Sequence, residues 1–151
     1  MTRIHLATAL VRRGDAVLLV ASRYPNHPQP LWNLPGGRQQ PGELLTQTAV
    51  RELLEETQLR GEVRELCYVS ESFDGTAHFT NFTFAVEAQG EASACSDTRD
   101  HIVDAAWVRL ADLPQRLQVA VVREPLLAFL RGKLPGYAGY ADAGISIVFP
   151  D

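Results

Sequence analysis

Residues 37–59 read GRQQPGELLTQTAVRELLEETQL. From residue 43 onward this stretch contains good helix formers and no interior Gly or Pro, which predicts a helix over residues 43–57. Pro41-Gly42 marks its start, and Glu43 is expected in the first turn, where a carboxylate stabilises the positive end of a helix.

The predicted helix carries three glutamates on one side. At about 100° per residue, Glu52, Glu55 and Glu56 fall within one arc, and the apolar residues around them face the other way. Neighbouring carboxylates on an exposed helix repel each other by about a few tenths of a kcal/mol per pair. Arg51 is adjacent in sequence but is expected to point off the arc, so a bound cation would relieve the repulsion better.

The chemistry of these side chains indicates which cation would fit. All the predicted ligands are oxygens, which suits Mg²⁺ or Mn²⁺ better than Zn²⁺. Mg²⁺ completes its coordination with water and phosphate oxygens, so the cluster would handle phosphates. The alternative is a solvated acidic helix face, and three glutamates alone do not separate the two interpretations.

The flanking pattern favours the metal site, because it resembles the Nudix box. That motif places Gly, Glu and Arg-Glu-apolar-any-Glu-Glu at fixed spacing, and the matching residues here are Gly37, Glu43, Arg51, Glu52, Leu53, Glu55, Glu56 and Leu59. One position departs, since Gln58 stands where the family usually has Gly. The helix is therefore expected to run further or to close with a non-Gly turn. The preceding residues 31–37 also resemble the family's approach to the box.

The resemblance covers about residues 3–131 and implies an α/β (α+β) fold, the Nudix-type α/β/α sandwich around a mixed β-sheet. It implies that the Gly37 carbonyl and the three glutamates bind the metal, and that Glu43 and Arg51 hold the loop and orient Glu52. The implied activity is Mg²⁺-dependent hydrolysis of a phosphoanhydride bond, with attack of water on phosphorus.

The general base has more than one candidate. In the family it is often the equivalent of Glu52 or a glutamate on a later loop. Here His101 stands at the acidic position of a segment that resembles that loop. His101 either acts as the base, since histidine titrates near neutral pH, or is an ordinary loop residue while Glu52, Asp100 or Asp104 contributes.

Signals for the substrate are weaker. Arg23 and Arg38 flank the expected cleft and are candidates to bind phosphates. Tyr24, Phe73 and Phe79 would either stack on a base or pack in the core. Residues 74–77 lack the Pro or Tyr that often marks ADP-ribose or dinucleoside polyphosphate subgroups. This favours a nucleoside triphosphate pyrophosphohydrolase resembling the nucleotide-pool sanitising branch.

Other functions stay open at this point. The substrate is alternatively a nucleotide sugar, ADP-ribose or a dinucleoside polyphosphate. A non-catalytic nucleotide-sensing module is a second class, although every carboxylate of the box is kept. An isomerase on the same fold would need a reactive cysteine in the cleft, and neither Cys67 nor Cys95 lies near the box in sequence.

The rest of the chain predicts a mixed sheet with helices packed on it. Turn signals at residues 12–15 and at Asp74-Gly75 join pairs of expected strands, and the Pro-rich residues 23–30 predict a surface loop. The expected strands are residues 4–11, 16–21, 62–72, 77–88 and 102–109, and a second helix is expected over residues 122–131, with Pro125 in its first turn. Residues 1–151 are expected to form a single domain, in which the tail 136–151, with its β-prone residues 145–149, has no clear place.

Composition limits the function classes. The chain has 151 residues, 46% hydrophobic and 21% charged, with a formal net charge of −4, so no global basic field would attract nucleic acid. The two cysteines are too few for a disulfide framework, and no signal peptide or membrane span is visible. We therefore expect a cytoplasmic monomer or homodimer with reduced thiols and a small-molecule nucleotide as its partner.

Overall fold

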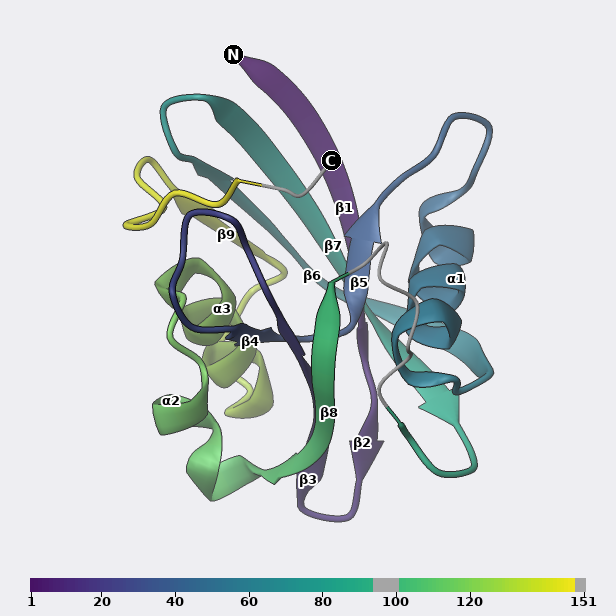
Figure 1. The fold of residues 1–151 in the computed structure, drawn as a ribbon. Coiled ribbons are helices and arrows are strands. Elements are labelled where there is room, and N and C mark those ends of the chain that lie inside the picture. The colour runs from purple at the N-terminus through teal and green to yellow at the C-terminus, as the bar shows by residue number, and fades with distance from the viewer. Residues whose placement is uncertain (94–100, 149–151) are drawn as a thin grey trace.

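The computed structural model of the protein describes residues 1–93 and 101–148 (Figure 1). The strands are β1 Thr2–Leu10, β2 Arg12–Arg13, β3 Ala16–Ser22, β4 Leu31–Asn33, β5 Gly36–Arg38, β6 Gly61–Phe73, β7 Ala77–Ala88, β8 Ile102–Arg109 and β9 Tyr137–Tyr140. The helical segments are α1 Leu45–Thr57, the 3-10 turn η2 Leu110–Asp112, α2 Leu113–Arg116 and α3 Ala120–Leu130. The expected strands and both expected helices are confirmed to within two residues at their ends. The elements β2, β5, β9, η2 and α2 were not predicted, and β2 occupies Arg12–Arg13, where a turn was expected.

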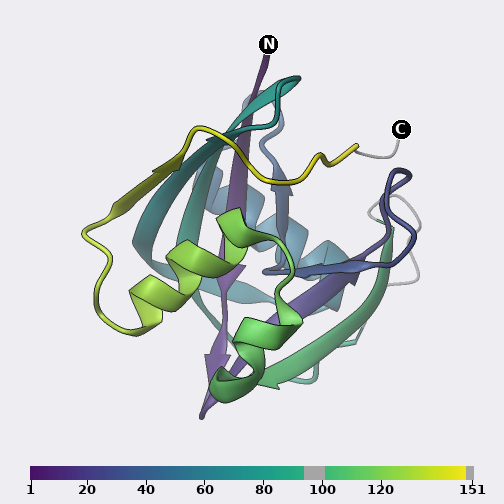
Figure 2. The same ribbon diagram turned by 90° about the vertical axis from the view of Figure 1, so that its left-hand side faces the viewer.

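The strands form two sheets that lie between helices. The larger sheet has the order β5-β1-β7-β6-β9, with β1 and β7 parallel and β6 and β7 antiparallel. The smaller has the order β2-β3-β4, and β8 pairs with β3. Figures 1 and 2 show α1 on one side of the strands and α2 and α3 on the other. The predicted mixed α/β architecture is confirmed.

Side-chain alternation along β1 separates the two faces of the larger sheet. Ala7 and Ala9 are fully buried in a core cluster with Ala49 and Leu53 of α1. Their neighbour Thr8 points the other way and lines a pocket on the opposite face. The sheet therefore has α1 on one face and the pocket on the other.

The start of α1 differs from the expectation, whereas its C-terminal end agrees with it. The helix begins at Leu45, so Glu43 precedes it, and the prediction that Glu43 lies in the first turn was wrong. The reason is that Leu44 has extended backbone and its N–H donates to the Gln47 side chain (2.8 Å). Of the two expected endings the structure has the non-Gly turn, because Gln58 adopts a left-handed conformation (φ 65°).

Pro125 does not lie in the first turn of α3, which corrects the expectation. The helix begins at Ala120, so Pro125 is an interior residue. It lacks the N–H that would donate to the preceding turn. Pro125 is buried and lines the pocket, so it contributes to packing at that wall.

The tail has a defined place in the fold. β9 adds to the larger sheet in parallel with β6, from Val69↔Tyr137 to Ser72↔Tyr140. Residues 145–148 then lie beside the loop of residues 23–30 (Figure 1) and form no strand, although they are β-prone. Phe149 lies outside the described residues.

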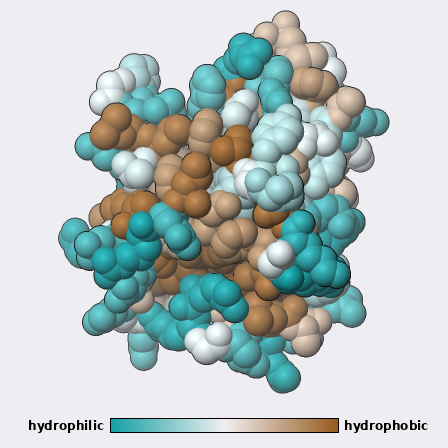
Figure 3. All heavy atoms as spheres, turned by 180° about the vertical axis from the view of Figure 1, so that it is seen from behind, coloured by the Kyte–Doolittle hydropathy of each residue, from teal (hydrophilic) through white to brown (hydrophobic). Residues whose placement is uncertain are grey.

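The view from behind shows apolar side chains gathered across the middle of that face, with hydrophilic side chains around them (Figure 3). Within the described residues, no helix has the length and apolar character needed to cross a membrane.

Cys67 is a half-buried free thiol. Its burial is the main cause that raises the pKa of the thiol to about 11, and the charge of Glu65 acts in the same direction. Cys95 lies outside the described residues.

Candidate active site

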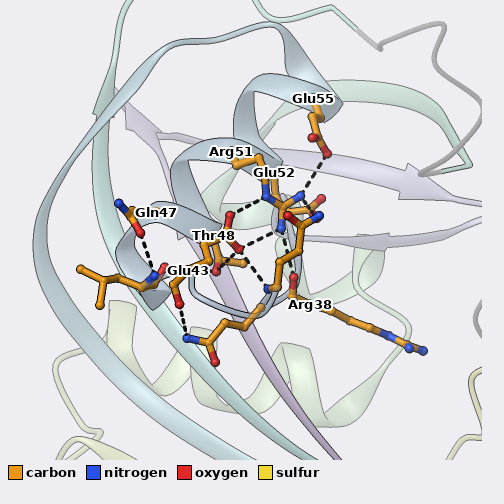
Figure 4. Close-up of polar contacts among 10 residues, drawn as sticks. Arg38, Glu43, Gln47, Thr48, Arg51, Glu52 and Glu55 are labelled. Carbon is orange, nitrogen blue, oxygen red and sulfur yellow. Dashed lines mark hydrogen bonds and ion pairs between the residues drawn. The ribbon is translucent and has the colours of Figure 1, made fainter.

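Arg51 organises the polar contacts at the start of α1 (Figure 4). Its Nε and Nη2 donate to the two carboxylate oxygens of Glu43, at 2.7 and 3.1 Å. Nη2 also donates to the backbone carbonyl of Arg38 (3.1 Å), which ties the loop before the helix to the helix itself. The hydrogen bond from Arg51 is the main cause that lowers the pKa of Glu43 from 4.5 to about 2. The same contact is the main cause that raises the pKa of Arg51.

Arg51 also reaches the glutamate cluster, so the expectation that it points off the arc was wrong. Its Nη1 donates to Glu52 Oε1 at 2.8 Å and to Glu55 Oε2 at 3.2 Å. The long side chain turns the guanidinium back along the helix surface, which counting by 100° per residue does not capture. Part of the repulsion between these carboxylates is therefore relieved by protein groups.

The carboxylate of Glu52 lies against the backbone of Gly37. A Cβ atom at residue 37 would lie 2.6 Å from the Glu52 carboxyl carbon, closer than such atoms approach. A larger residue at position 37 would have to displace the Glu52 carboxylate. Glu56 is held to the neighbouring residue, since the Gly36 N–H donates to its Oε1 at 3.0 Å. The loop and the helix thus bring together the backbone and the two carboxylates that the sequence analysis proposed for a metal.

Burial distinguishes the three glutamates. Glu52 and Glu56 are buried, with 6% and 4% of their surface exposed, whereas the side chain of Glu55 is 33% exposed. Burying carboxylates is costly unless donors or a cation compensate. In the described ranges, 1–93 and 101–148, no group of three or more His, Cys, Asp or Glu side chains is already arranged to hold a metal ion. This donor set still fits Mg²⁺, which takes few protein carboxylates and keeps places for water and phosphate.

A pocket of about 120 Å³ lies on the sheet face opposite α1. Its walls come from β1, β4, β6, β7, α3 and the tail, and include Leu6, Thr8, Leu34, Ser70, Phe79, Asn81, Thr83, Val122 and Ile147. Its floor contains neutral polar groups. Thr8 and Thr83 share a hydrogen bond (2.8 Å), and the Asn81 amide donates to Thr83 at 3.0 Å. The Asn81 carbonyl oxygen is buried without a partner among the described residues, so the floor keeps an unused acceptor.

Tyr24 connects the pocket with the carboxylate cluster. It lines the pocket, and burial raises the pKa of its phenol, with the negative charge of Glu56 acting in the same direction. Phe79 lines the pocket as well, so two of the proposed substrate-binding aromatics lie there. Phe73 instead packs edge-on against His78, with ring centroids 4.5 Å apart.

The two arginines proposed for substrate binding lie elsewhere. Arg23 and Arg38 are exposed, and neither lines the pocket. Figure 4 shows the Arg38 side chain extending away from the carboxylates. The structure therefore does not bring these two side chains together with Tyr24 and Phe79.

His101 precedes β8 and has a left-handed backbone conformation (φ 55°). Its carbonyl accepts a hydrogen bond from the Arg23 N–H at 3.0 Å, so this backbone joins the ends of β8 and β3. Asp104 is exposed in β8, and its carboxylate accepts from the Ala105 N–H. Asp100 lies outside the described residues.

Sequence reasoning missed the polar floor and the tail wall of the pocket. A signal for the floor existed, since Asn81 and Thr83 alternate with aromatic residues along β7. No sequence pattern placed Thr83 opposite Thr8 and Asn81 opposite Leu6, because these pairings depend on the parallel register of β1 and β7.

Comparison with known proteins identifies the family. A family model of the NUDIX domain matches residues 2–130. The phosphatase NudJ of Escherichia coli is 30% identical over 130 residues, which are 85% of this chain and 81% of NudJ. The NAD-capped RNA hydrolase NudC of Pseudomonas fluorescens is 33% identical over 105 residues, which are 70% of this chain and 36% of NudC. The chain thus spans only about a third of the length of NudC.

Solved structures agree with this assignment. A NUDIX hydrolase from Nitrosomonas europaea has a TM-score of 0.75 and 22% identity, with 97% of this chain and 98% of the other covered. The solution structure of the Escherichia coli ORF135 protein has a TM-score of 0.71 and 25% identity, with 89% and 95% covered. The first likeness shows the shared fold, and the family model covers most of the chain. The protein is therefore a member of the Nudix hydrolase family.

Proposed function

We propose that the protein is a Mg²⁺-dependent pyrophosphohydrolase of nucleoside triphosphates, with Mn²⁺ as an alternative metal. The observation that carries the proposal is the placement of two buried carboxylates, Glu52 and Glu56, on Gly37 and Gly36, together with a pocket that no Lys or Arg of the described residues lines. Phosphates would lie with the metal at the carboxylates, and the nucleoside would enter the pocket past Tyr24.

The chemistry of the pocket supports this orientation. No Lys or Arg is among the described residues that line it. Glu71 is the charged side chain at its wall, and it already accepts from Tyr137 and contacts His78. A phosphate would find no positive charge there, whereas a base would find apolar walls and neutral hydrogen-bonding groups.

The size of the pocket supports a substrate with one nucleoside. At about 120 Å³ it is smaller than the roughly 300–1,000 Å³ of sites that enclose a whole drug-sized ligand. It therefore has room for one end of a nucleotide. This favours a nucleoside triphosphate over a dinucleoside polyphosphate. A nucleotide sugar or ADP-ribose is the alternative substrate.

The residues take the following roles. The Gly37 carbonyl, Glu52, Glu55 and Glu56 would hold the metal, and the metal would supply neutralisation of phosphate charge and a lowered pKa of bound water. Glu43 and Arg51 are positioning residues, because they fix the loop and the Glu52 carboxylate through direct hydrogen bonds. Glu52 takes the proton from the attacking water, with His101 as the alternative base.

Arg23 and Arg38 are proposed to contact phosphates at the outer edge of the site. Both are exposed and lie on segments next to the site, Arg23 after β3 and Arg38 at the end of β5. From there they would meet a phosphate chain that extends out of the pocket.

A panel assay tests the proposal. Nucleoside triphosphates (oxidised and deoxy forms included), ADP-ribose, nucleotide sugars and dinucleoside polyphosphates are incubated with Mg²⁺, and the products are resolved by chromatography. Glu56→Gln is the inactive variant and Glu65→Gln, an exposed change outside the site, is its matched control. We expect release of pyrophosphate from triphosphates in the wild type and the control only. If a compound of the panel bound tightly and none were cleaved, the proposed function would be wrong and the protein would be a nucleotide-sensing module.

A further inference from the structure

We infer that residues 137–148 form a roof over the pocket and determine which nucleobase it accepts. The inference rests on the proposed function, because it names the part of the nucleotide that the pocket holds. It assigns a specificity role to a segment that lies outside residues 2–130, where the family model matches.

The roof contributes apolar side chains to the pocket. Tyr140, Ala143, Ile145 and Ile147 all line it. Along residues 145–148 half-buried and exposed residues alternate, so Ile145 and Ile147 face inward and their neighbours face solvent. Leu6 of β1 and Phe79 of β7 line the same pocket from the sheet. A flat, uncharged group between these walls would bury apolar surface on both sides.

One end of the roof is fixed by the larger sheet. β9 pairs with β6, and the Ala143 N–H donates to the Phe73 carbonyl at 2.8 Å. A turn follows in which the Gly144 N–H donates to Asp142 (2.9 Å) and Gly144 has φ 73°, a conformation that favours glycine. The residues that follow this turn, Ile145 and Ile147, line the pocket.

The other end is held by the loop between β3 and β4. The Asn26 amide donates to the Ser146 carbonyl (2.7 Å) and accepts from the Val148 N–H (3.0 Å), as a neighbouring strand would. His27 Nε2 also lies 2.7 Å from the Ser146 carbonyl. The same loop supplies Tyr24 to the pocket. The roof is therefore positioned at both ends, and its apolar row is held over the opening.

Binding of mononucleotides tests the roof without any catalytic step, because they contain no phosphoanhydride bond. The four nucleoside monophosphates and ribose 5-phosphate, which has no base, are titrated by calorimetry. Fluorescence of Trp32, a pocket-lining residue, gives a second readout in a Trp107→Phe background. The variants are Ile147→Ala and Asn26→Ala, and the matched control is Val148→Ala, an exposed position on the same segment.

We expect Ile147→Ala and Asn26→Ala to raise the Kd of the preferred mononucleotide about tenfold and to reduce the preference among bases. Ribose 5-phosphate should bind all variants alike, and Val148→Ala should match the wild type within about twofold. Unchanged mononucleotide binding, equal weakening for ribose 5-phosphate, or no mononucleotide binding by the wild type would overturn the inference. Mononucleotide binding that depends on the roof, without cleavage of triphosphates, would refute the proposed function alone.

Discussion

The two sides of the larger sheet are built differently. On the α1 side, charged groups close in sequence, within residues 37–56, contact one another through Arg51. On the pocket side, neutral and apolar groups come from segments as distant as Leu6 and Ile147. The first arrangement suits chemistry on phosphates, which is common to a family. The second suits selection of a substrate, which differs between its members.

The largest effect is expected from Glu52, which tests the charged side directly. Glu52→Gln keeps the shape but removes the negative charge from the buried group on Gly37, so kcat should fall about 10²–10⁴-fold. Steady-state hydrolysis of the triphosphate found in the panel measures it, with mononucleotide affinity as the control. A loss confined to mononucleotide affinity would contradict the division between the two sides.

Gly37→Ala is expected to have the next largest effect. The added Cβ would lie 2.6 Å from the Glu52 carboxyl carbon and displace it, so kcat should fall about 10–100-fold. The Mg²⁺ concentration that gives half of the maximal rate should rise. Activity equal to that of the wild type would mean that the contact with Glu52 does not set the geometry of the site.

Glu43→Gln should lower stability by about 1–3 kcal/mol at pH 7, because it weakens the contact with Arg51. The folded-state pKa of Glu43, about 2, lies below the ordinary value of 4.5, so this stabilisation is complete above about pH 4.5 and is lost as the pH falls towards 2. Urea unfolding at pH 7 and pH 3 measures the difference between variant and wild type. If the difference in unfolding free energy between variant and wild type grew at low pH, the contact between Glu43 and Arg51 would not be its source.

The smallest effect is expected from His101. If Glu52 is the base, His101→Ala should lower kcat by less than about tenfold, far less than Glu52→Gln does. The pH profile of kcat should keep its shape. If His101→Ala lowered kcat as much as Glu52→Gln does, His101 would be the general base. The charged side of the sheet would then include the residues at the start of β8.

Much of the fold could be predicted because its signals are local. The turn signals at residues 12–15 and at Asp74-Gly75 lie between the strands that they were expected to join, although Arg12–Arg13 form β2. The helix α1 ends at a non-Gly turn, which was one of the two expected outcomes. The errors have two origins. The helix α3 begins at Ala120, two residues before the expected start, so Pro125 is an interior residue. Arg51 turns towards the carboxylates of Glu43 and Glu55, a pair of contacts that local propensity does not encode.

The sequence by itself determined the family and the residues proposed for chemistry, because the box has its spacing within one loop and one helix. Only the tertiary structure decided what surrounds that chemistry. It buries Glu52 and Glu56 while leaving Glu55 partly exposed, and it closes a pocket with a tail that had no assigned place. The physical reason is that burial and pocket walls depend on strand register and on contacts between residues more than a hundred positions apart, such as Asn26 with Ser146.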